Sequence, residues 1–262
     1  MEQTISHRTT KILFGVRQES RIRRTGLITL ILAILFTLST YVLQATLNYP
    51  AILTAQASFA LPLFAQGGIA VLLAFVGLLL CGVLLLVISL GLAQHLPSRA
   101  RMTLLVTAGA TGAIWVLSAL GWLVLVPIWS AGGAVQNYQI FGPFILIFYG
   151  ILVPLLLVIW TLLLVRLFRA YRVLGSVSAV GLLLVLLRSL IWEMNVILPI
   201  ETGYYATAGL LAILAMLGES LWLVWLFLFG FYLMRRSDKT AIAVPMLHVE
   251  SADSKEEGEE NV

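Results

Sequence analysis

Charged residues are scarce in this chain. Asp, Glu, Lys and Arg together make up 11% of its 262 residues, whereas 61% of the residues are hydrophobic. An ordinary soluble domain carries roughly 25% charged residues, so this composition excludes a conventional soluble fold. The composition instead suits a lipid bilayer. A helix crosses the hydrocarbon core with about 20 apolar residues and satisfies its own backbone polar groups.

Cysteine and histidine are equally scarce, and this limits the chemistry. The single cysteine, Cys81, excludes an internal disulfide or a thiolate cluster, and we interpret it as a small apolar side chain within the bundle. His7, His95 and His248 are scattered along the chain, and no phosphate-binding loop or paired nucleophile and base is present. The sequence therefore predicts no metal, no cofactor and no enzymatic activity.

Long apolar runs dominate what is present. Six of them are long enough to span a membrane, at residues 26–47, 67–93, 102–127, 141–165, 173–197 and 207–234. The length of the first run and of its basic leader indicates an uncleaved anchor and not a signal peptide. We therefore predict an all-α, polytopic membrane protein built as a bundle of six transmembrane helices.

Basic residues alternate between the connections of these runs. They occupy the N-terminal segment, the second-to-third and fourth-to-fifth loops and the C-terminal flank, and the other three connections contain none. The basic residues are Arg8, Lys11, Arg17, Arg21, Arg23, Arg24, Arg99, Arg101, Arg166, Arg169, Arg172, Arg235, Arg236 and Lys239. Because positively charged loops stay in the cytoplasm, this alternation predicts a multi-pass protein of the cytoplasmic membrane with both termini inside. Membrane lipids are the expected partners, and the distribution of charge argues against nucleic acid.

Three regions follow from this pattern. They are a basic cytoplasmic segment at 1–25, the six-helix domain at 26–236 and an acidic cytoplasmic tail at 237–262, which we expect to be disordered. The connection at 48–66 is expected to form a short helix or a lid at the outer interface. Aromatic residues at the ends of the runs, including Tyr49 and Tyr138, are expected at the same interface.

Only three charged residues lie clearly within the spans: Arg188, Glu193 and Glu219. A charge near the bilayer centre costs on the order of 2.5–3.5 kcal/mol or more, so such groups usually face the interior and find a partner. Counted from the cytoplasmic ends of the last two helices, Arg188 and Glu219 both lie about 22 Å deep. We therefore predict that they are level with each other and form a pair.

The spacing of small residues supports that pair. Gly181 precedes Arg188 by seven positions, and Ala215, Glu219 and Trp222 share one face of the last helix. Small residues let helices approach closely in lipid, which would bring the guanidinium onto the carboxylate.

Two interpretations of the pair stay open. In one it fixes the register of two helices, and in the other it lines a polar cavity that binds a substrate. Glu193 and Asn195, which lie further outward, and Trp222 are secondary polar candidates. Pro127, Pro143 and Pro154 are expected to bend the third and fourth helices.

Three segments carry a family resemblance: "RIRRTGLITLILAILF", "LFRAYRVLGSVSAVGLLLVLL" and "LGESLWLVWLFLFGFYLMR". The chain resembles bacterial six-span integral membrane proteins that are grouped only as a domain of unknown function. The resemblance implies a bacterial cytoplasmic membrane, no assigned activity, and Glu219 at the position of the glutamate near the C-terminus of that family.

Two functions remain as hypotheses. The first is a non-catalytic membrane component, such as a scaffold, a sensor or a partner subunit, with a buried Arg188–Glu219 pair. The alternative is a small-molecule or proton-coupled transporter that uses the same pair. A protein partner or a second copy of the chain is compatible with both hypotheses.

Overall fold

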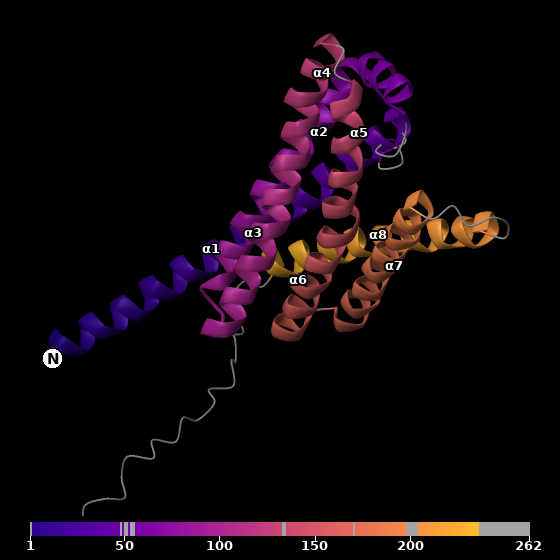
Figure 1. Cartoon of the computed structure of the whole chain (residues 1–262). Helices are drawn as coiled ribbons and strands as arrows, with labels where there is room; N and C mark the ends of the chain where they lie inside the picture. The colour runs from indigo at the N-terminus through magenta and orange to yellow at the C-terminus, as the bar shows by residue number, and fades with distance from the viewer. Residues whose placement is uncertain are drawn as a thin grey trace, which may run out of the picture.

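The computed structural model describes residues 2–47, 49, 52, 56–132, 135–169, 171–197 and 204–235, with side chains over most of these ranges. Within them every regular element is a helix. The helices are, in chain order, α1 (Glu2–Leu47), α2 (Ala57–Ala93), α3 (Ser98–Leu120), η2 (Gly121–Leu125), α4 (Val126–Gly132), α5 (Val135–Leu146), η3 (Ile147–Leu152), α6 (Val153–Phe168), α7 (Arg172–Ile197) and α8 (Tyr204–Arg235) (Figure 1).

Six helical segments are long and apolar enough to cross a membrane. They are Arg21–Leu47, Ala57–Ala93, Ser98–Trp129, Ile147–Phe168, Arg172–Leu190 and Ile213–Arg235. This result confirms the predicted all-α bundle of six transmembrane helices. The acidic tail and residues Arg236 and Lys239 lie outside the described residues, so the prediction for the 237–262 segment stays a prediction.

The connection after α1, at residues 48–66, is partly helical. Residues 57–67 form the first part of α2 and are separated from the rest by a kink at Gly68, whose φ of 52° lies in the region that favours glycine. Phe64 in this part stacks on Trp122 with ring centroids 5.6 Å apart. The expected short helix is therefore present, and it packs against the bundle.

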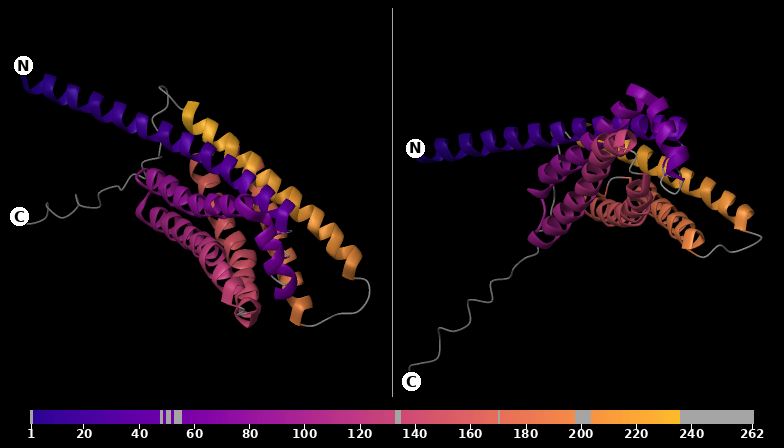
Figure 2. Two further views of the ribbon diagram at one scale, coloured as in Figure 1. Left: turned by 90° about the horizontal axis from the view of Figure 1, so that it is seen from above. Right: turned by 45° about the horizontal axis from the view of Figure 1, so that its top comes forward.

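The spanning helices form a closed ring. Each packs against the next in the chain, with α3 against α6, and α8 returns to pack against α1 as well as α7. Figure 2 shows α8 running beside α1. The first and last spans are therefore neighbours, and the interior of the ring is bounded by all six.

Glycines mark the closest approaches between helices. A Cβ atom built on Gly181 of α7 would lie 2.5 Å from the Cα atom of Gly218 in α8, and one built on Gly26 of α1 would lie 2.7 Å from the carbonyl oxygen of Gly230. The backbones therefore touch at these points, as expected where no hydrophobic force drives helices together. The predicted close approach of the last two helices is confirmed, although Gly218 makes it and not an alanine.

Two prolines coincide with changes of helix type. The π-helical turns η2 and η3 come directly before Pro127 and Pro154. Proline has no N–H to offer to the carbonyl group four residues earlier, and its ring clashes with that carbonyl. A wider i→i+5 turn relieves this conflict without breaking the span, and such turns are frequent at functional sites.

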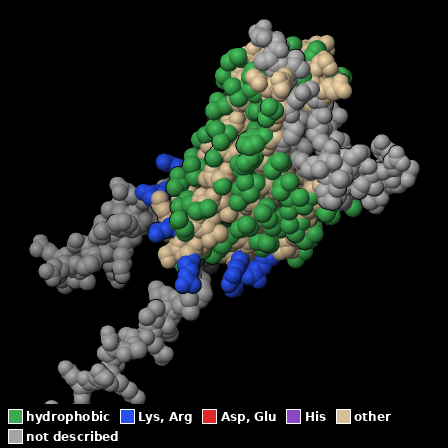
Figure 3. All heavy atoms as spheres, viewed as in Figure 1, with side chains coloured by type: hydrophobic (Ala, Val, Ile, Leu, Met, Phe, Trp, Pro, Cys, Tyr) green, Lys and Arg blue, Asp and Glu red, His purple; other side chains and the backbone are tan. Residues whose placement is uncertain are grey.

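Arginines gather at one end of the bundle. The exposed arginines among the described residues are Arg21, Arg23, Arg24, Arg99, Arg101, Arg166, Arg169, Arg172 and Arg235. Figure 3 shows blue side chains at one end of an otherwise apolar flank. We call this end the arginine end. This grouping agrees with six spans, because alternate connections of an antiparallel bundle lie at the same end.

The backbone contact at Gly218 generates a stability prediction. Gly218→Ala should lower the free energy of unfolding by about 1–3 kcal/mol, because the added methyl group meets the backbone of α7. Unfolding of the purified protein in mixed micelles measures this change. Gly109→Ala is the matched control, because nothing lies within 4 Å of a Cβ atom at that position. Equal stability of the two variants would contradict the described crossing.

Candidate functional site

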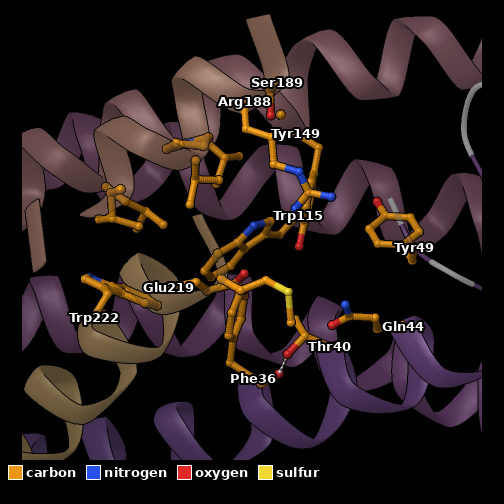
Figure 4. A pocket seen from close by; sticks show the side chains of 17 residues that line it. Phe36, Thr40, Gln44, Tyr49, Trp115, Tyr149, Arg188, Ser189, Glu219 and Trp222 are labelled. Atoms are coloured by element: carbon orange, nitrogen blue, oxygen red, sulfur yellow. Dashed lines mark hydrogen bonds between the residues drawn. The ribbon is translucent and has the colours of Figure 1, made fainter. Parts of the chain in front are cut away.

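A cavity of about 140 Å³ lies between α1, α3, α6, α7 and α8. Among the described residues, the charged ones that line it are Arg188 from α7 and Glu219 from α8. An engineered apolar cavity of about 150 Å³ holds a benzene molecule, so this cavity is large enough for a small ligand. Figure 4 shows the guanidinium of Arg188 directed into the cavity, with helix α1 on the opposite side.

Helix α1 supplies the wall opposite Arg188, with Phe36, Thr40 and Gln44 one turn apart. The Thr40 hydroxyl donates to the carbonyl oxygen of Phe36 at 2.8 Å, so this hydroxyl is satisfied within its own helix. Gln44 is exposed, whereas Phe36 is buried. The wall therefore runs from a buried end at Phe36 to an open mouth at Gln44.

The π-helical turn η3 brings Tyr149 and Gly150 to the cavity. Tyr149 packs edge-on against Tyr49, with ring centroids 5.4 Å apart. Tyr49 lies in the connection between α1 and α2 and also lines the cavity. The connection after α1 therefore forms part of the cavity wall. The sequence predicted a short helix or a lid at 48–66 but did not predict this contact with the cavity.

Tyr49 and Tyr138 are buried, with 7% and 1% exposure, so neither ring lies on the lipid-facing surface; their place at the level of the outer interface stays a prediction. The Tyr138 hydroxyl donates to the carbonyl oxygen of Ile52 at 2.7 Å and ties α5 to the connection after α1. Burial raises the pKa of both tyrosines, and both therefore stay neutral at physiological pH.

Arg188 and Glu219 share the cavity but do not form the predicted direct pair. Both side chains are partly buried, and no ion pair joins them in the described structure. Helices α7 and α8 cross at Gly181 and Gly218; Arg188 lies two turns from that crossing, on the side away from the arginine end, whereas Glu219 lies beside it. At about 1.5 Å rise per residue, the two Cα atoms are offset by roughly 12 Å along the helices.

The predicted equal depth of the two charges is therefore wrong. That prediction counted the depth of each residue from the end of its own helix, but the crossing of Gly181 and Gly218 sets the register between α7 and α8. Because the two charges do not contact each other, both can bind a ligand in the cavity.

An aromatic wall adjoins Glu219. Phe36 lies between Trp115 and Trp222, with ring centroids 5.2 and 5.8 Å away. All three rings line the cavity, and Trp222 shares a face of α8 with Glu219 at i+3 spacing. The Trp115 indole N–H is buried without a hydrogen-bond partner among the described residues. We call Phe36, Trp115 and Trp222 the aromatic wall.

A second aromatic group closes the cavity toward the arginine end. The Trp222 indole N–H donates to the Thr161 hydroxyl at 3.0 Å, and that of Trp160 donates to the Ser89 hydroxyl at 2.9 Å. Trp225 lies one turn beyond Trp222, edge-on to Trp160 at 6.4 Å, and is fully buried. We call Trp160, Trp225, Ser89 and Thr161 the tryptophan layer; the hydroxyl groups of Ser89 and Thr161 accept the hydrogen bonds of Trp160 and Trp222. The layer separates the cavity from the arginine end.

The sequence predicted part of this site. It singled out Arg188, Glu219 and Trp222, which all line the cavity. It missed Trp115 and Tyr149, since an aromatic residue in an apolar helix carries no local signal of the face it presents. Helix α7 runs through Glu193 and Asn195, whose side chains lie outside the described part of the chain.

The described residues contain no group of three His, Cys, Asp or Glu side chains that could hold a metal ion. Comparison of the chain with family models, curated proteins and solved structures finds no significant match. The resemblance to the six-span family therefore stays an expectation, and the function is argued from the geometry of the cavity alone.

The separation of the two charges predicts that neither is essential for folding. Arg188→Met and Glu219→Gln should each leave the free energy of unfolding unchanged or raise it, because neither change removes a close partner and a charge within the membrane is costly. Removing one member of a buried ion pair would instead cost about 3–5 kcal/mol. Unfolding in mixed micelles distinguishes these outcomes.

Trp222→Ala serves as the comparison for those two variants. Loss of this buried ring and of its hydrogen bond to Thr161 should cost about 3–5 kcal/mol. A loss of that size for Arg188→Met or Glu219→Gln, restored in the double variant, would show that the charges form a structural pair.

Proposed function

We propose that the protein is a non-catalytic, multi-pass membrane component that binds a small charged ligand in the cavity of Arg188 and Glu219, in the manner of a sensor subunit. One observation carries the proposal: both charges line one cavity and neither neutralises the other through a direct contact. Charges within a membrane are costly, and those that remain usually mark a ligand or ion site. A bound ligand would supply the missing partners.

The proposed orientation places the arginine end in the cytoplasm. Nine exposed arginines at one end support it, since basic loops resist translocation and attract anionic lipid headgroups. The mouth at Gln44 then opens on the outer side of the cytoplasmic membrane. A ligand would enter from outside and stop at the tryptophan layer.

The tryptophan layer favours a sensor over a transporter. Passage to the arginine end would require the hydrogen bonds of Trp160 and Trp222 to Ser89 and Thr161 to break and the edge-on rings of Trp160 and Trp225 to separate. A binding component needs no such opening. Transport is the alternative that the following experiment detects.

Thiol labelling tests both the orientation and the depth of access. In a Cys81→Ala background, a membrane-impermeant maleimide added outside intact cells should label Gln44→Cys at the cavity mouth. Gln94→Cys, which replaces an exposed residue beside Arg21 at the arginine end, should be labelled only after the cells are opened. If Gln44→Cys is not labelled by reagent added outside the cells, the proposed entry of the ligand at Gln44 is wrong.

Ser89→Cys reports on the tryptophan layer in the same assay. This position is fully buried and bonded to Trp160, so a sensor predicts no labelling from either side. Labelling of Ser89→Cys from both sides would instead show alternating access and favour the transporter. Leu38→Cys, which is exposed on the flank of α1, is the control for a lipid-facing position and should stay unlabelled.

A further inference from the structure

The two charges that the described residues give the cavity sum to zero, and this limits the ligands that fit it. Among the side chains that the structure describes, Arg188 and Glu219 are the charged ones that line it. In a medium of low dielectric constant, a ligand with one charge would neutralise one of them and leave the other without a partner. A ligand with both a positive and a negative group would neutralise both and leave no net charge in the membrane.

The aromatic wall indicates which end of such a ligand lies where. Trp222 shares a helix face with Glu219, and Phe36 joins Trp222 to Trp115. The faces of aromatic rings attract cations, and groups of such rings recognise methylated ammonium ions. The guanidinium of Arg188 suits a carboxylate, which it binds through two parallel hydrogen bonds.

The size of the cavity sets a further limit. A volume of about 140 Å³ is close to that of the cavity that holds benzene, which corresponds to a ligand of roughly six to eight non-hydrogen atoms. Larger zwitterions, such as an entire lipid headgroup with its glycerol backbone, exceed this volume.

We propose that the ligand is a small zwitterion whose methylated ammonium group lies between Glu219 and the aromatic wall and whose carboxylate binds Arg188. This inference rests on the proposed function and specifies its ligand class. It requires no reaction, because the ligand binds and leaves unchanged.

Equilibrium binding of isotopically labelled trimethylglycine to the full-length protein in lipid nanodiscs tests the proposal. Two competitors of similar shape separate the charges: 3,3-dimethylbutyrate lacks the positive charge, and choline lacks the carboxylate. We expect saturable binding of trimethylglycine and competition at least about tenfold weaker by each of the other two, because each leaves one buried charge unpaired. Glycine, which lacks the methyl groups, should also compete at least about tenfold less well.

Variants connect the binding to the residues. Arg188→Met and Glu219→Gln should each weaken binding of trimethylglycine by about tenfold or more. Arg101→Met and Trp225→Phe should bind as the wild type does, because the first lies at the arginine end and the second lies behind the cavity. Should Arg188→Met accumulate poorly, Arg188→Lys keeps the charge but loses the two-pronged contact, and we expect intermediate binding.

The outcomes separate this inference from the proposed function. Equal competition by 3,3-dimethylbutyrate would show an anion site at Arg188 and overturn the zwitterion while leaving a ligand-binding cavity. Equal competition by glycine would overturn the methylated ammonium group. Absence of trimethylglycine binding would overturn the inference. If Gln44→Cys also resisted labelling from outside, the proposed function would fail with it.

Discussion

The close approach of α8 to its two neighbours is the constraint on which the bundle depends. Gly218 touches the backbone of α7 at Gly181, and Gly230 touches that of α1 at Gly26. In lipid no hydrophobic force pulls helices together, so packing at such points must hold them. Because α8 contacts both the first span and the fifth, these crossings close the ring and fix which side chains of α8 point inward.

The glycine crossings also explain the distribution of charge and aromatic residues in the interior. They set the register of α7 against α8, which leaves Arg188 and Glu219 at different depths around one cavity. Below the cavity the same face of α8 places Trp222 and Trp225 against Thr161 and Trp160. The half of the bundle away from the arginine end therefore contains a polar space, and the tryptophan layer fills the interior toward the arginine end.

The sequence predicted those properties that a single helix displays alone. The apolar runs predicted six spans, and the basic loops predicted one charged end, because length and charge need no knowledge of neighbours. The depth of Arg188 relative to Glu219 was wrong, since it depends on where two helices cross. Tyr149 and Trp115 were missed for a related reason: a wider turn before Pro154 and the packing of α3 decide the direction in which these rings face.

Arg188 and Glu219 face a shared cavity and not each other. A density map of the protein in lipid nanodiscs, at a resolution that separates side chains and bound water, would show this arrangement. We expect the guanidinium and the carboxylate to be apart, with density for water or a small ligand between them. Direct contact between the two groups, or either one directed into lipid, would contradict it.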